Sequence, residues 1–311
     1  MSPRPLDAYG VDYEGDAGGP AGPADQAIRA GDRYVLRHDP LRARVLGPGG
    51  EAAEVRLGVD PGAFFCAHHF ATLIDLVGAP PLEGRARVGF VHVPPDRAAG
   101  PAAAAAPRLH PRAVNLEQIA RVIAVACRGL AAGPGDRSLL ITGFGAFQGI
   151  ADNPTAAYVG EPRALARTVA LASPGAASID SSALDEGARV RAFRLADGRR
   201  LHLATATLAL GRSDADALAG RYIDPERAAA DLRRAIEAAS ARCGRLDAVI
   251  GLGVDSTQAL GGGAPTFKVE VQTRGWGRGG RAGPLRRDLA LAEVFLRARE
   301  LGDELLVFDD S

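Results

Sequence analysis

The chain has 311 residues, of which 47% are hydrophobic and 24% are charged, a balance typical of folded proteins and not of disordered ones. Its 37 basic and 37 acidic residues cancel, and no cationic stripe stands out, so the composition does not indicate a nucleic-acid or anionic-membrane surface. No apolar run approaches the roughly 18 residues of a membrane span, and the first residues lack the apolar core of a signal peptide, so we expect a cytoplasmic protein.

The first half of the chain alternates segments typical of strands and of helices. Apolar runs bounded by Gly and Pro predict strands, and apolar residues spaced three or four apart predict helices. In order, we expect a loop over 1–32, a strand over 53–59, a helix from 63 to about 77, a strand over 86–93, an Ala- and Pro-rich loop over 100–111, and a helix over 115–130 with Asn115 as a candidate N-cap.

The second half continues this alternation after a flexible, Gly-rich connector over 131–136. Strands alternating with helices predict an α/β fold with three α/β/α layers around a mostly parallel, twisted sheet. In order, we expect a strand over 138–143, a helix over 161–171, an excursion over 173–200, strands over 190–195 and 201–208, a helix over 224–241, strands over 247–253 and 266–272, a helix over 289–301 and a short apolar end over 304–308.

The cysteines and the lysine restrict the chemistry. Three cysteines, Cys66, Cys127 and Cys243, are too few and too scattered for a disulfide framework, and no Cys-x-x-Cys pair indicates zinc, so we expect no metal and no cofactor. Cys127 and Cys243 lie in helical patterns and are expected in the core. Lys268 is the single lysine, which excludes a P-loop and leaves any Schiff-base chemistry to that residue alone.

Two reactive side chains lie where a helix begins and where a strand ends. Cys66 opens the helix predicted from 63, where free backbone amides and the positive end of the dipole favour a thiolate; the alternative is a small buried hydrophobic side chain. His92 lies near the end of an apolar strand, where an imidazole acts either as a base or as the partner of a local carbonyl. Because reactive groups of α/β sheets gather beyond the carboxyl ends of strands, both positions are candidates for a site.

A glycine-rich loop and a carboxylate complete the unusual segments. The loop Thr142–Gly149 is followed by Asn153-Pro154-Thr155; its glycines allow tight turns, and its two phenylalanines could wall a small pocket. It is a weak nucleotide loop, because the third glycine is misplaced and no acidic ribose partner follows at the usual distance. Glu270 lies in the middle of a predicted strand, where a solvated strand face is the simplest interpretation of it in isolation.

Taken together, four motifs resemble those of the pyroglutamyl peptidase I (pyrrolidone carboxyl peptidase) family of cysteine peptidases. That family has a Thr-Gly-Phe-x-x-Phe-x-Gly loop followed by Asn-Pro-Thr, a Gly-x-Tyr/Phe-x-Cys motif, a Gly-Phe-Ile/Val-His-Val-Pro motif, and a glutamate after a Val-Gly-x-Asp/Gly-Ser-like turn. The matching segments here are Thr142–Gly149 with Asn153–Thr155, Gly62–Cys66, Gly89–Pro94, and Leu252–Ser256 with Glu270 downstream.

The order of the motifs differs from that of the family. The family runs loop, Glu, Cys, His, whereas this chain runs Cys, His, loop, Glu, which implies a circular permutation. Residues Leu6–Gly15 resemble the stretch that normally follows the glutamate strand. We therefore expect one domain over 1–311, with the family's C-terminal half at 33–132, its N-terminal half at 138–272, an insertion at about 160–200 and a C-terminal extension at about 276–311.

The resemblance implies a Cys–His–Glu triad that removes an N-terminal pyroglutamyl group through an acyl-enzyme. Cys66 would be the nucleophile, His92 the base and acid, and Glu270 the group that orients the imidazole. Amides at the start of the Cys66 helix would hold the oxyanion. By the same resemblance, Phe144 and Phe147 would sandwich the lactam, Asn153 would hydrogen-bond it and Phe65 would close the pocket. The implied partner is a small peptide or lactam-amide substrate.

Several positions depart from the family pattern. Tyr9 aligns with a family arginine near the oxyanion site, Ala67 replaces a common asparagine, and Gln148 occupies a position that is normally small. Two alternatives therefore stay open, an amidase acting on a non-peptide lactam amide and a non-catalytic relative that binds a small ligand or a protein partner. His68 and His69 are expected on the surface of their helix. The C-terminal helix is expected to pack across the cut edge or to mediate self-association into a homo-oligomer.

Overall fold

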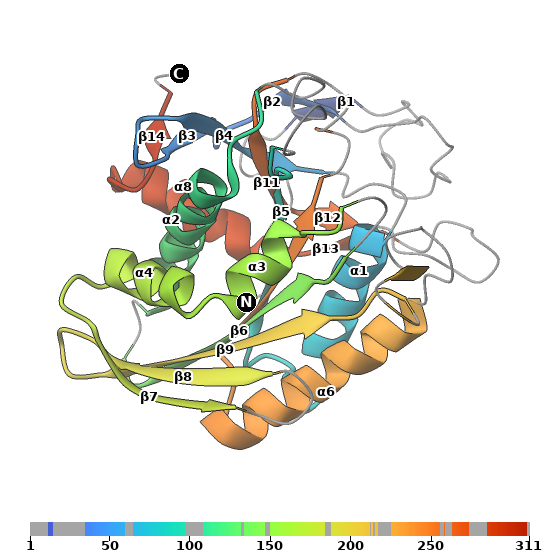
Figure 1. Ribbon diagram of the computed structural model, residues 1–311, viewed down its shortest axis with the longest axis vertical. Coiled ribbons are helices and arrows are strands. Elements are labelled where there is room, and N and C mark those ends of the chain that lie inside the picture. The colour runs from blue at the N-terminus through green and yellow to red at the C-terminus, as the bar shows by residue number, and fades with distance from the viewer. Residues whose placement is uncertain are drawn as a thin grey trace.

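The computed structural model describes residues 12–14, 35–59, 65–97, 108–131, 134–146, 150–183, 188–211, 213, 215–216, 225–255, 258, 263–273 and 285–309. Helices cover both faces of a large central sheet in this part of the chain (Figure 1). The sequence-based prediction of an α/β fold in three layers is therefore confirmed. None of the helices in the described ranges is long and apolar enough to cross a membrane.

The central sheet has a parallel middle and antiparallel edges. Strands β5, β10, β6 and β9 run parallel to one another, whereas β11 runs antiparallel to β5 and parallel to β4. Both outer ends consist of antiparallel pairs. In spatial order the strands are β14 (Val307–Phe308), β3 (Ala43–Leu46), β4 (Ala52–Gly58), β11 (Thr266–Glu270), β5 (Arg87–Val93), β10 (Ala248–Val254), β6 (Arg137–Phe144), β9 (Arg200–Leu208), β8 (Arg189–Arg194) and β7 (Ala177–Ala183).

Two hydrophobic cores lie on opposite faces of the sheet. One contains side chains of the helices α2 (Arg112–Ala131), α3 (Pro154–Gly160), α4 (Pro162–Ala172) and α8 (Ala290–Glu300). The other contains side chains of α1 (Phe65–Val77) and α6 (Pro225–Cys243). Alternate residues of one strand enter different cores: Val91 and Val93 enter the first, and Phe90 the second. This alternation places His92 on the α1 and α6 face.

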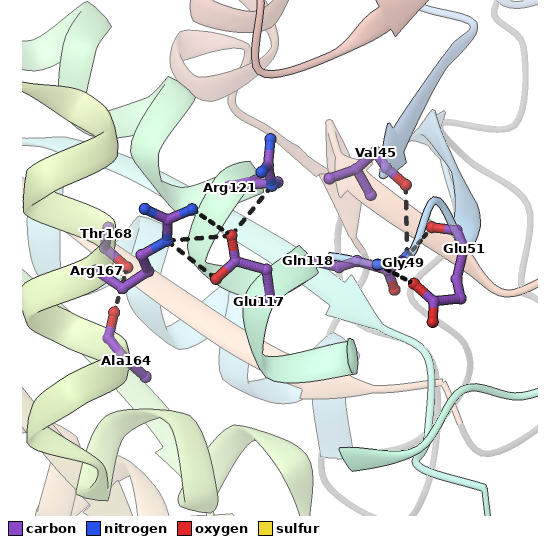
Figure 2. Close-up of polar contacts among 9 residues, drawn as sticks. All are labelled: Val45, Gly49, Glu51, Glu117, Gln118, Arg121, Ala164, Arg167 and Thr168. Carbon is purple, nitrogen blue, oxygen red and sulfur yellow. Dashed lines mark hydrogen bonds and ion pairs between the residues drawn. The ribbon is translucent and has the colours of Figure 1, made fainter. Parts of the chain in front are cut away.

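Helix α2 joins the two halves of the chain that surround it. From Gln118 to Cys127 every residue except Arg121 is buried, and each fully buried aliphatic side chain contributes about 1.5–3 kcal/mol. The Gln118 amide donates to the Val45 carbonyl (3.4 Å) and the Glu51 carbonyl (2.9 Å) beside the β3–β4 turn. On another side, Glu117 accepts hydrogen bonds from Arg167 of α4 and from Arg121 (Figure 2). The helix is thus tied to segments that both precede and follow it.

The start of α2 differs from the prediction. The helix begins at Arg112, three residues before Asn115, so Asn115 is not its N-cap. The Asn115 amide nitrogen instead donates to the Pro94 carbonyl (2.9 Å) and to the Asp96 carboxylate (2.8 Å). It therefore fixes the chain that leaves β5 against the first turn of α2, a tertiary contact that local capping patterns do not reveal.

Several short elements were not predicted. Helix α3 precedes α4, and strand β7 lies inside the predicted excursion at 173–200. Strand β1 (Asp12–Glu14) pairs with β2 (Val35–His38), so the loop predicted over 1–32 contains a short strand. The predicted strand at 266–272 is divided into β11 and β12 (Gln272–Thr273), of which β12 pairs with β13 (Arg286–Arg287). Most of these elements are too short, and β7 and α3 have too few regularly spaced apolar residues, for local periodicity to predict them.

The C-terminal segment occupies both a face and an edge of the sheet. Helix α8 lies over β5 and beside α2, and strand β14 pairs with β3 at the sheet edge. The packing of α8 is close, because a Cβ at Gly89 would lie 2.6 Å from the Leu291 side chain. Helix α8 therefore covers a face of the sheet and not an edge. The strand that follows it, β14, occupies the edge position.

Candidate active site

Three neighbouring strands and one helix bring the predicted reactive groups together. Strands β11, β5 and β10 are adjacent, and α1 packs over β5 and β10. Glu270 is the last residue of β11, His92 lies near the end of β5, and Cys66 is the second residue of α1. The cysteine is partly exposed, whereas the histidine and the glutamate are buried. Residues far apart in the sequence therefore meet on one face of the sheet.

The imidazole of His92 is held by the carboxylate of Glu270. His92 Nδ1 lies 2.8 Å from Glu270 Oε1, and the two side chains are 6% and 0% exposed. Because this contact occupies Nδ1, Nε2 is the nitrogen left to interact with the Cys66 sulfur, to which the imidazole also hydrogen-bonds. The other carboxylate oxygen, Glu270 Oε2, is buried without a hydrogen-bond partner among the described residues.

The sulfur of Cys66 lies against the backbone of β10. A Cβ placed on Gly253 would be 2.7 Å from Cys66 Sγ, so the sulfur occupies space that a side chain at that position would fill. Gly253 is the residue of β10 that pairs in register with His92 of β5. Adjacent strands are about 4.8 Å apart, so this location brings the sulfur within reach of the imidazole.

The electrostatics favour a charged His92. Burial lowers the pKa of its imidazole, but the charge and hydrogen bonding of the Cys66 sulfur and of the Glu270 carboxylate outweigh burial and raise the pKa from 6.5 to about 10. The imidazolium is therefore the stable form at neutral pH, with sulfur on one side and carboxylate on the other. Such an imidazolium stabilises a neighbouring thiolate, the nucleophilic form of cysteine.

Two aromatic side chains meet at the start of α1. Phe144, at the end of β6, meets Phe65 edge to face with 5.2 Å between ring centroids, and both rings are buried. The backbone amide of Phe144 donates to Thr155 Oγ1 (2.9 Å), which fixes the start of the glycine-rich loop. Phe147, the second predicted wall of the pocket, lies outside the described residues, as does Gln148.

Asn153 has a structural role that the sequence analysis did not anticipate. Its side-chain oxygen accepts hydrogen bonds from the backbone amide (3.0 Å) and the hydroxyl (2.8 Å) of Thr155, which caps α3. Its side-chain nitrogen donates to the Gly145 carbonyl (2.9 Å). These contacts fix the glycine-rich loop against α3, and the predicted hydrogen bond of Asn153 to a substrate stays a prediction.

His69 is not on the helix surface, and the prediction for it was wrong. It is 2% exposed, lies 4.8 Å from Phe144 between ring centroids, and shares a hydrogen bond with Thr142 Oγ1 (3.3 Å). Burial, together with the charge of His68, lowers the pKa of His69 to about 3, so its ring is neutral. Phe65, His69 and Leu73 recur every four residues and are all buried, so this spacing was the signal that could have placed His69 inside.

This buried neutral ring predicts an acid-sensitive contribution to stability. Since the pKa of His69 in the folded protein, about 3, lies below the ordinary value of 6.5, its contribution is complete above pH 6.5 and is lost as pH falls toward 3. Between pH 7 and pH 5 the loss is about 2 kcal/mol. We expect His69→Gln to remove that part of the pH dependence, measured by urea unfolding at both values. His202→Gln, at a partly exposed site on β9, is the control; equal losses in wild type and His69→Gln would contradict the prediction.

The single lysine lies beside this site, which the sequence analysis did not foresee. Lys268 pairs in register with His92, and its ammonium lies 2.7 Å from Asp255 Oδ2, just after β10. A lysine held as an ammonium by a carboxylate is a poor amine nucleophile, so the contact does not favour Schiff-base chemistry. Within the described ranges, no group of three or more His, Cys, Asp or Glu side chains could hold a metal ion.

The other cysteines lie away from the three central groups. Cys127 is fully buried in α2, where burial raises the pKa of its thiol to about 12. Cys243 is partly buried in the last turn of α6 and packs against the core on the α1 face. The core position expected for these two cysteines is therefore confirmed for Cys127 and partly for Cys243.

Comparisons of the chain with protein-family models, curated proteins and solved structures found no match.

Proposed function

We propose that this protein is a cysteine peptidase that removes an N-terminal pyroglutamyl group. The observation that carries the proposal is the contact of His92 with Glu270 on one side and with the Cys66 sulfur on the other. This arrangement has the components of a triad: a nucleophile, a base that touches it, and a group that orients the base. The four family-like motifs supply the substrate class. We further propose that the chain is a circularly permuted relative of that family and works in the cytoplasm, where thiols stay reduced.

The first half of the reaction forms an acyl-enzyme. Because the proton already lies on His92, Cys66 Sγ attacks as the thiolate and forms a bond to the carbonyl carbon that joins the lactam ring to the next residue. The carbonyl oxygen becomes an oxyanion, for which the free amides of the first turn of α1 are the nearest donors by position. His92 then donates its proton to the leaving amine as the C–N bond breaks, which leaves a thioester and releases the shortened peptide.

The second half restores the enzyme. His92 takes a proton from a water molecule, whose oxygen attacks the thioester carbon; the C–S bond breaks, the thiolate is reformed beside the imidazolium, and 5-oxoproline is released. In both halves Glu270 holds Nδ1, which keeps Nε2 aimed at the reacting atoms. Phe65 and Phe144 pack edge to face against each other, and their apolar rings would border the pocket that holds the lactam ring.

A fluorogenic pyroglutamyl amide tests the proposal. We expect turnover of that amide, and a preference of about 100-fold or more over the prolyl amide, which lacks the lactam carbonyl that a matched polar site would bind. Cys66→Ala is the control and is expected to be inactive. Release that persists in Cys66→Ala would reject the thiol mechanism. Failure of every lactam amide to react, with Cys66 unreactive toward iodoacetamide, would favour a binding protein instead.

A further inference from the structure

Two positions without side chains flank the three central groups. Gly58, at the end of β4, pairs in register with Glu270 of β11, and Gly253 of β10 pairs in register with His92 of β5. The spatial order β4, β11, β5, β10 therefore places one glycine on each side of the strands that carry the glutamate and the histidine. In-register neighbours on parallel strands project side chains to the same face, so a Cβ at either position would point at this site.

The space at Gly58 is filled by the carboxylate of Glu270. A Cβ built on Gly58 would lie 2.3–2.5 Å from Oε1, Oε2 and Cδ of Glu270, far inside contact distance. The same carboxylate carries the 2.8 Å contact to His92, and its Oε2 atom has no hydrogen-bond partner among the described residues. The carboxylate therefore packs directly against the Gly58 backbone while one of its oxygens contacts the imidazole.

The space at Gly253 is filled by the sulfur of Cys66. A Cβ there would lie 2.7 Å from Cys66 Sγ and 2.7 Å from the tip of the Phe90 ring, which is fully buried. The sulfur thus rests directly on the strand next to His92. We propose that Gly58 and Gly253 are positioning residues, whose missing side chains allow the Glu270 carboxylate and the Cys66 sulfur to sit on the sheet backbone in contact with His92.

The experiment uses Cys66 alkylation, because it needs no knowledge of the substrate. The positioning role of Gly58 and Gly253 rests on the proposed function only for measurements of lactam-amide turnover. Alkylation of Cys66 by iodoacetamide is followed against pH by peptide mass spectrometry, and the His92 Nδ1–H signal by NMR. If wild-type Cys66 is reactive at mildly acidic pH but no lactam amide is hydrolysed, the proposed function fails while the positioning role of the glycines is still tested in full.

In Gly58→Ala, the atoms that must yield belong to the end of a flexible side chain, so we expect the fold to survive and the His92–Glu270 contact to be lost. The rate of Cys66 alkylation at pH 6 is expected to fall about 10-fold. The inflection on the alkaline side of the rate-against-pH curve, which reports loss of the His92 proton, is expected to move down by about one pH unit. The NMR signal of the His92–Glu270 contact is expected to disappear. Glu270→Asp, one methylene shorter, is expected to lower reactivity alone but to restore part of it in Gly58→Ala.

Gly253→Ala separates the two glycines. It is expected to slow Cys66 alkylation about 10-fold while the His92–Glu270 NMR signal persists, and it supplies an independent test if Gly58→Ala fails to fold. Gly89→Ala is the matched control, since its Cβ would lie 2.6 Å from Leu291 on the opposite face of the strand that carries His92. Its fold is expected to be less stable but its alkylation profile unchanged. A wild-type profile in folded Gly58→Ala, an equal shift in Gly89→Ala, or no recovery in the double variant would overturn the proposal.

Discussion

Replacement of Cys66 by serine or alanine is expected to lower kcat/KM for a pyroglutamyl amide by about 10⁴-fold or more. The sulfur is the group that contacts His92, and an imidazolium stabilises a thiolate but is a poor base for a hydroxyl. Serine is therefore expected to be nearly as inactive as alanine. Steady-state kinetics, together with loss of the acyl-enzyme signal in a quenched mass spectrum, measure this effect.

The control for this substitution is Cys243→Ser. Cys243 is also partly exposed and lies in the last turn of a helix on the same face, but it is not one of the groups that meet His92. Its replacement is expected to leave kcat/KM within about 2-fold of wild type, since the substitution is small and removes no group that meets His92. A Cys243→Ser protein that loses activity as Cys66→Ser does would point to the wrong nucleophile.

Replacement of Glu270 by glutamine is expected to lower kcat by about 10²–10⁴-fold and to change the pH profile. Glutamine can still contact Nδ1 of His92 but carries no charge. The part of the increase in the pKa of His92 that comes from the charge of Glu270 is therefore lost. The alkaline limb of the profile, which reports loss of the imidazolium, is expected to move downward from about pH 10. Rates measured from pH 5 to pH 10.5 test the shift.

The free energy of unfolding of Glu270→Gln, measured against pH, is a second test of the same substitution. Since the pKa of folded His92, about 10, lies above the ordinary value of 6.5, the stabilisation from its partners is complete below pH 6.5 and is lost as pH rises through 10. The stability deficit of Glu270→Gln is therefore expected to be largest below pH 6.5 and to shrink toward pH 10. Glu117→Gln, whose carboxylate binds Arg121 and Arg167 on α2 and α4 (Figure 2), is the control. An equal pH dependence in both variants would argue against the His92–Glu270 pair.

Long elements with clear periodicity were predictable from the sequence. The strand expected over 86–93 is β5, the strand over 138–143 lies within β6, and the helix over 289–301 contains α8. Each has enough residues for apolar spacing to identify its type. Most of the missed elements have only two to four residues, and β7 and α3, with seven each, lack a regular spacing of apolar residues.

For the candidate site, the sequence predicted the residue types but not all of their surroundings. Its residue types, a cysteine at a helix start, a histidine near a strand end and a glutamate in a strand, were recognisable from the order of amino acids alone. The sequence did not reveal that His69 is buried and neutral or that Asn153 binds its own loop. It also did not reveal the contact of Lys268 with Asp255. The burial of His69 and the contact of Lys268 depend on which helices and strands are neighbours in the fold.

The amino-acid sequence by itself determined the fold class and the chemically distinctive side chains, because both follow from local spacing and residue type. Only the tertiary structure decided that His92 and Glu270, 178 residues apart, touch at 2.8 Å, and that Gly58 and Gly253 make room for the groups beside the imidazole. The physical reason is that strand order and register fix such contacts, and these are properties of the whole sheet, which no local pattern encodes.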